Sequence, residues 1–183
     1  IGVNSEWDEE EIESRNPTLT DTKGMSKEEI AFYNLFWEVD VPSMQAYVKE
    51  HPDALAAGWS RINIDKSALT GDGTSIRTIQ GEQVLAIDAK NRILLLRVRD
   101  TGYIGVLAVA KDPAQLRCCA SSGIGDYGED LDVIVRNNDG LLGITASGFY
   151  DPNGGGTGGE IAGYAMCDGK EYGPHYDPST GYK

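Results

Sequence analysis

Two carboxylates, Asp151 and Glu160, stand on either side of a run of glycines and are the side chains best placed to do chemistry. Glycoside cleavage typically uses such a pair, one carboxyl protonated and the other ionised, across the scissile bond. The glycines from 154 to 159 can supply a nest of backbone N–H groups for an anion. Of the 23 glycines, eleven lie between Gly140 and Gly173, so we interpret this segment as the rim of a binding or catalytic site.

Few other side chains in the sequence could join them. The chain has two histidines, His51 and His175, the side-chain type that most readily acts as a base near neutral pH, and His175 follows the glycine segment closely enough to reach it. Thr145 and Ser147 can donate hydrogen bonds to a bound anion. No Gly-x-Ser-x-Gly elbow and no Gly-Lys-Ser/Thr phosphate loop is present, so neither a serine nucleophile nor a nucleotide site is predicted.

Calcium is an alternative occupant of the same loop. Asp151, Asn153 and Gly156 match the start of an EF-hand loop, but Ala162 stands where a bidentate glutamate is needed. We therefore expect neither a cofactor nor a resident metal, with bound calcium as the alternative.

The composition of the chain argues against two classes of binding partner. The chain has 183 residues, a formal net charge of −13 and a pI near 4.5, which argues against nucleic acid and against anionic lipid. It contains neither a transmembrane stretch nor a visible signal peptide, and it begins at Ile1. We expect a processed or excised chain whose parent carries any membrane anchor upstream.

Three cysteines, Cys118, Cys119 and Cys167, form no Cys-x-x-Cys pair. Adjacent cysteines on a strand point to opposite faces, so Cys118 and Cys119 do not easily share a partner. Buried free thiols are the expectation, and one long-range disulfide to Cys167 in an oxidising compartment is the alternative.

The N-terminal part is predicted to be helical after an acidic lead-in over residues 1–24. Ser26 and Glu29 form a capping box at the start of a helical hairpin over 25–58. Its second helix begins near Pro42 and ends before Pro52.

From Ser75 onward the apolar period is typical of strands in consecutive hairpins. Residues 130–136 are expected to form one short helix because acidic groups lie at their N-terminal end, and a further strand is the alternative. The predicted strands are 76–79, 84–87, 93–98, 103–109, 116–120, 141–146 and 161–167. The runs at 93–98 and 104–109 are almost continuously apolar, so we expect both of their faces to be covered. The fold class is α+β, a helical hairpin followed by a mostly antiparallel sheet.

Two motifs resemble the phosphodiester glycosidase domain, the bacterial relative of the enzyme that uncovers mannose 6-phosphate. They are Gly-Ile-Thr-Ala-Ser-Gly-Phe-Tyr-Asp-Pro-Asn-Gly at 143–154 and Ala-Gly-Tyr-Ala-Met-Cys-Asp-Gly-Lys at 162–170. The segment 103–113 is similar to the family's strand and Asp-Pro turn. The likeness covers roughly 81–173, within a predicted domain at 75–183.

The resemblance implies hydrolysis of sugar-1-phosphate diesters in cell-envelope or exopolysaccharide glycans, at the surface of or outside a bacterial cell. Its substrate is a carbohydrate phosphodiester, and its expected catalytic residues are Asp151, Glu160 and Thr145. The expected substrate-binding residues are Ser147, Gly148, Phe149, Asn153, Gly158, Gly159, Gly163 and His175.

Departures from the family pattern keep a second interpretation open. The family commonly has Asn at Thr145 and Pro at Ile161, and it carries Arg-Thr-Ala and Asp-Gly-Gly-x-Ser segments that this sequence lacks. We expect an N-terminal fragment, inactive alone, whose exposed sheet edge favours self-association. The alternative is a non-catalytic cell-surface domain that binds glycan or acts as a scaffold.

Overall fold

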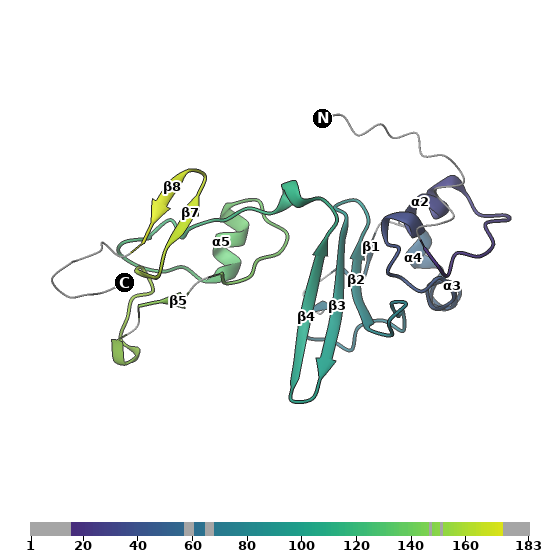
Figure 1. The fold of residues 1–183 in the computed structure, drawn as a ribbon, viewed down its shortest axis with the longest axis horizontal. Helices are drawn as coiled ribbons and strands as arrows, with labels where there is room; N and C mark the ends of the chain where they lie inside the picture. The colour runs from purple at the N-terminus through teal and green to yellow at the C-terminus, as the bar shows by residue number, and fades with distance from the viewer. Residues whose placement is uncertain (1–15, 57–60, 65–67, 147, 151, 174–183) are drawn as a thin grey trace. The chain divides into compact units, whose positions relative to one another are not determined.

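A computed structural model describes residues 16–56, 61–64, 68–146, 148–150 and 152–173 of the chain. The chain divides into two compact units, Ile1–Gln115 and Leu116–Lys183 (Figure 1). None of the helices in the described ranges has the length and hydropathy that a membrane crossing requires.

The first unit begins with the predicted helical hairpin. Its helices are α2 (Lys27–Leu35), α3 (Val41–Glu50) and the short α4 (Asp53–Ala56). The Ser26 hydroxyl accepts the Glu29 N–H at 3.2 Å, and the Glu29 carboxylate accepts the Ser26 N–H at 2.6 Å, which confirms the capping box. Asp40 caps α3 by accepting the Ser43 N–H at 2.9 Å.

A four-stranded antiparallel sheet follows, and it confirms the α+β class (Figure 1). Its strands, in order, are β1 (Arg61–Ile62), β2 (Gln83–Asp88), β3 (Ile93–Asp100) and β4 (Tyr103–Ala110). The hairpins β2–β3 and β3–β4 were both predicted from the alternation of apolar runs and turn residues. A 3₁₀ turn at Pro113–Gln115 ends the unit, where the Asp112 carboxylate accepts the Ala114 N–H.

Aromatic residues of α2 and apolar residues of β2 and β3 make the core of this unit. Phe36 and Leu94 are fully buried within it. The expected lead-in needs correction at its end, because Asn16 and Leu19 are buried too. Asn16 Nδ2 donates to the carbonyl of Val39 at 3.0 Å, which holds the segment against the connection between α2 and α3.

Two strand predictions in the first unit were wrong in detail. Residues 76–79 form only isolated bridges, in which Thr78 pairs with Val39 and Arg77 with Gln83. Strand β4 is not covered on both faces, since Ile104 is 69% exposed and Leu107 47% exposed. It is the last strand in the sheet order. An apolar run in the sequence does not indicate whether its strand will lie at the edge or in the middle of a sheet. Self-association through that edge stays a prediction.

The second unit contains one helix and two small strand pairs within its described residues. They are α5 (Leu131–Asn137), β5 (Gly148–Phe149) with β6 (Ile161–Ala162), and β7 (Ala165–Cys167) with β8 (Lys170–Tyr172), with a 3₁₀ turn at Pro152–Gly154. The helix confirms the prediction for 130–136. Residues 116–120 and 141–146 are not strands, because neither segment has a ladder partner among the described residues. The predicted strand 161–167 is split at Gly163, whose φ is +115°.

Candidate functional site

The glycine run packs against a second loop rather than standing alone. Residues 121–129 and 154–160, both in the second unit, are joined by two backbone hydrogen bonds. The Gly125 N–H donates to the Gly159 carbonyl at 2.8 Å, and the Gly128 N–H donates to the Thr157 carbonyl at 2.9 Å. We call this pair of loops the double loop.

Close backbone contact explains why two positions in the double loop must be glycine. A Cβ atom at Gly159 would lie 2.5 Å from the backbone nitrogen of Tyr127. A Cβ atom at Gly128 would lie 2.7 Å from the carbonyl oxygen of Gly158. Real Cβ atoms do not approach backbone so closely, so any side chain here would separate the loops. Part of the glycine content therefore holds the double loop together.

The base of the glycine run is closed by the strand pair β5–β6. Gly148 pairs with Ala162 and Phe149 with Ile161, and the Tyr150 N–H donates to the Glu160 carbonyl at 2.8 Å. The predicted partner of 161–167 was the segment 141–146, so this prediction was wrong in its register: 161–162 return beside 148–149 instead. The pairing brings three predicted site residues, Gly148, Phe149 and Glu160, to one end of the double loop.

Glu129 fastens the 121–129 loop internally. Its carboxylate accepts the Ser122 N–H at 2.6 Å and the Ser121 hydroxyl at 3.0 Å. These hydrogen bonds, the one from the Ser122 backbone first, hold the pKa of Glu129 below its usual range. The sequence prediction missed this loop, although paired serines followed by Gly123, Gly125 and Gly128 are a signal for a tight backbone turn.

The remaining predicted site residues fall into two groups. Asp151, Ser147 and His175 lie outside the described residues. Thr145, Asn153, Glu160 and Gly163 are exposed, whereas Gly158 is half-buried and Gly159 buried. The structure thus assembles the glycines and Glu160 but does not bring Thr145, Asn153 or Gly163 into a hydrogen bond with another described residue.

Exposed aromatic rings are common in this unit and were not predicted as site residues, apart from Phe149. Their exposed fractions are 55% for Tyr127, 52% for Phe149, 43% for Tyr150 and 66% for Tyr164. Such rings offer flat apolar faces with a polar edge to a ligand. Tyr127 belongs to one loop of the double loop, and Tyr150 lies between β5 and the 3₁₀ turn that leads into the other.

Cationic groups are few in the described part of the second unit, which contains Arg117, Arg136 and Lys170. Arg117 lies 3.6 Å from the Asp168 carboxylate, and Arg136 pairs with Asp132 at 2.6 Å. The Lys170 ammonium lies 4.9 Å from the centre of the Tyr172 ring. An anion at the double loop would therefore be held by backbone N–H groups rather than by an unpaired arginine.

Metal binding finds no support in the described residues, where no group of three or more His, Cys, Asp or Glu side chains could hold an ion. Asp151, on which the calcium alternative depends, lies outside them.

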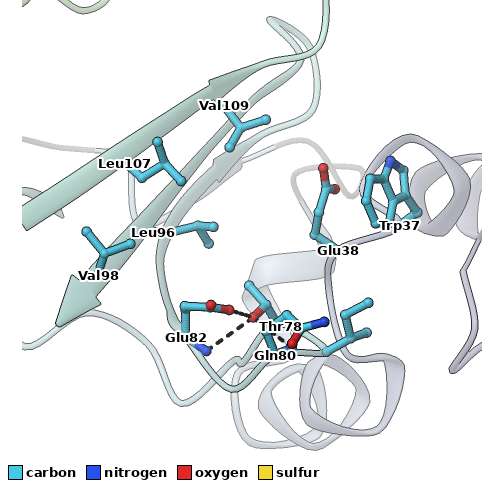
Figure 2. Close-up of a pocket in the computed structure, with 10 residues that line it drawn as sticks. Trp37, Glu38, Thr78, Gln80, Glu82, Leu96, Val98, Leu107 and Val109 are labelled. Carbon is cyan, nitrogen blue, oxygen red and sulfur yellow. Dashed lines mark hydrogen bonds between the residues drawn. The ribbon is translucent and has the colours of Figure 1, made fainter. Parts of the chain in front are cut away.

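The first unit contains a separate cavity of about 260 Å³ between the helical hairpin and the sheet (Figure 2). Trp37, Leu96 and Leu107 line its apolar walls. Two of its carboxylates already have partners, because the Thr78 hydroxyl donates to Glu82 and Lys111 forms an ion pair with Glu38. The side chain of Gln80 also lines the cavity.

The chain matches no family model, no curated protein and no solved structure. Function is therefore inferred from the motifs in the sequence and from the geometry of the double loop.

Proposed function

We propose that this chain provides one wall of the active site of a hydrolase that cleaves sugar-1-phosphate diesters in cell-envelope or exopolysaccharide glycans. The observation that carries the proposal is the double loop, a backbone-held glycine run that ends at Glu160. The resemblance of 143–170 to phosphodiester glycosidases supports the same chemistry. On that resemblance we place the protein outside the cell or at the cell surface.

In this proposal the double loop binds the phosphate group through backbone N–H groups. A phosphodiester carries a single negative charge, whereas a phosphomonoester carries about −1.5 to −2 at pH 7. The second unit is rich in carboxylates and its arginines already have acidic partners. A second charge on the ligand would meet repulsion without compensation, so the site favours diesters over monoesters.

The proposed reaction breaks the bond between the sugar C1 and the phosphate oxygen, and water supplies the new oxygen at C1. Negative charge grows on the departing phosphate in the transition state, so N–H donors aimed at it stabilise the transition state more than the ground state. Glu160 or Asp151 transfers the proton or orients the sugar. The exposed rings of Tyr127 and Phe149 offer faces for the sugar.

Turnover also needs residues on the opposite side of the substrate, which form the second wall of the proposed active site. The sequence contains neither the Arg-Thr-Ala nor the Asp-Gly-Gly-x-Ser segment that the resemblance implies. We therefore propose catalysis for a polypeptide that carries both walls and ligand binding for this chain by itself.

A non-catalytic glycan-binding domain is the second candidate. It is favoured by the substitutions at Thr145 and Ile161 and by the exposed aromatic rings of the second unit. The two candidates differ in one outcome, because only the hydrolase releases free sugar from a bound diester.

Sugar release by the complete gene product tests the proposal, with the methyl diester of N-acetylglucosamine 1-phosphate as substrate. We expect release that falls about 10²-fold or more in Glu160→Gln or Asp151→Asn, since general acid–base groups contribute 10²–10⁴. The matched control is Asp139→Asn, an exposed carboxylate on a turn outside the double loop. Saturable binding without release would support the second candidate, and neither binding nor release would contradict both.

A further inference from the structure

Two thiols that are distant in the sequence meet in the second unit. The Sγ atoms of Cys118 and Cys167 lie 2.7 Å apart, although the residues are 49 positions apart in the chain. The flanking residues also meet, because Arg117 lies 3.6 Å from the Asp168 carboxylate. The two segments are therefore adjacent at consecutive positions, and the sulfur contact is not an isolated approach of two side chains.

Regular secondary structure holds one of the two cysteines, Cys167, in place. Cys167 is the last residue of β7, and the tight turn at Asp168 and Gly169, both with positive φ, leads into β8. Cys118 lies in the irregular segment before the 121–129 loop and is exposed, whereas Cys167 is 8% exposed. Cys119, half-buried, is the neighbouring thiol that could compete.

The described residues of the second unit form only a small apolar core. Among its described apolar side chains, only Cys167 is buried. A unit with so small a core commonly depends on covalent cross-links.

We propose that Cys118 and Cys167 form a disulfide that closes the segment containing the whole double loop. The oxidant is a low-molecular-weight disulfide. The Cys118 thiolate attacks it and forms a mixed disulfide while one thiolate departs. The Cys167 thiolate then attacks the Cys118 sulfur, and the second thiolate departs. Two electrons pass to the oxidant, and the two cysteine protons end on the released thiols.

The environments of the two sulfurs set this order of attack. Desolvation and the neighbouring Cys118 thiol raise the pKa of Cys167 to about 11. Cys167 is therefore mostly protonated at neutral pH, and exposed Cys118 is the thiol that meets the oxidant first.

Peptide mapping of the full chain tests the proposal after incubation with oxidised glutathione, followed by alkylation and trypsin. Trypsin cuts after Arg117, Arg136 and Lys170, which places Cys118 and Cys119 in one peptide and Cys167 in another. We expect these peptides to be joined in the wild type and in Cys119→Ser. In Cys118→Ser we expect the disulfide link between the two peptides to be lost.

Thermal unfolding provides the second measurement. Closing a loop of this length should raise the Tm by roughly 10 °C in the wild type and in Cys119→Ser. Cys118→Ser, which leaves the buried Cys167 intact, should show no rise. Full alkylation of all three thiols after oxidation would overturn the proposal. A Cys119–Cys167 bond that forms equally readily in Cys118→Ser would overturn it too.

Discussion

Gly159 shows how a single position couples two loops, 121–129 and 154–160, that are not adjacent in the chain. Its carbonyl accepts the Gly125 N–H, and its Cα faces the backbone of Tyr127 without room for a methyl group. The family resemblance led us to expect the same residue as a substrate contact. In the structure, its close backbone contact with the 121–129 loop is what allows the two loops to pack together.

Gly159→Ala should therefore destabilise the second unit by about 1–3 kcal/mol, because backbone must move to admit the methyl group. The control is Gly148→Ala, whose Cβ would meet Ala162 at an ordinary 3.8 Å. Urea unfolding of both variants is the measurement. Equal stabilities would show that the loops are not packed as described.

Glu129 gives the double loop a dependence on pH. Its pKa is lowered in the folded protein, so its contribution is complete above the unfolded-state value of about 4.3. It is lost as the pH falls through the lower folded value. In an NMR titration the Ser122 amide of the wild type should shift with a midpoint below about 4.3. Glu129→Gln should abolish that step, and an unchanged titration in the variant would assign it to another group.

At the scale of elements, the strands of the first unit differ sharply in burial despite similar sequences. Leu94 on β3 is fully buried, and Leu107 on β4 is 47% exposed. The difference follows from position, since β3 pairs on both sides and β4 ends the described sheet (Figure 1).

Leu94→Ala should cost about 2–5 kcal/mol of unfolding free energy, the range for emptying a buried leucine site. Leu107→Ala makes the same chemical change on the edge strand and should cost less than about 1 kcal/mol. Chemical denaturation of the two variants provides the comparison. A cost for Leu107→Ala that equals that of Leu94→Ala would mean that β4 is covered in solution.

Elements with a local signal could be predicted from the sequence. Ser26 and Glu29 predicted the start of α2, and the apolar runs at 84–87 and 93–98 predicted β2 and β3. Residues 116–120 and 141–146 have the same β-forming composition, but pairing depends on a partner strand that composition does not reveal. The contact of Gly125 with Gly159 is likewise non-local, so the glycine run was predicted as a ligand rim and its packing role was missed.

At the scale of the whole molecule, the two units are stabilised in different ways. The first unit buries aromatic and aliphatic side chains from helices and strands. The second buries one apolar side chain among its described residues and depends on backbone hydrogen bonds between loops. The proposed site thus lies in the unit with the smaller core.

Hydrogen exchange should show this contrast. Under reducing conditions, amides of β2 and β3 should exchange slowest, and those of 121–129 and 154–160 should exchange well before them. Mass spectrometry of peptic fragments measures both regions in one experiment. Equal protection of the two regions would show that the second unit has a core beyond its described residues.

The most direct test of the account is an NMR titration of this chain with the methyl diester of N-acetylglucosamine 1-phosphate. The account predicts saturable shifts of the amides at 154–159, with affinity for the diester about fivefold or more above that for the monoester. Gly159→Ala should weaken the binding of both the diester and the monoester. Unshifted glycine amides at saturating diester, or tighter binding of the monoester, would contradict the proposal that the double loop binds a sugar phosphodiester.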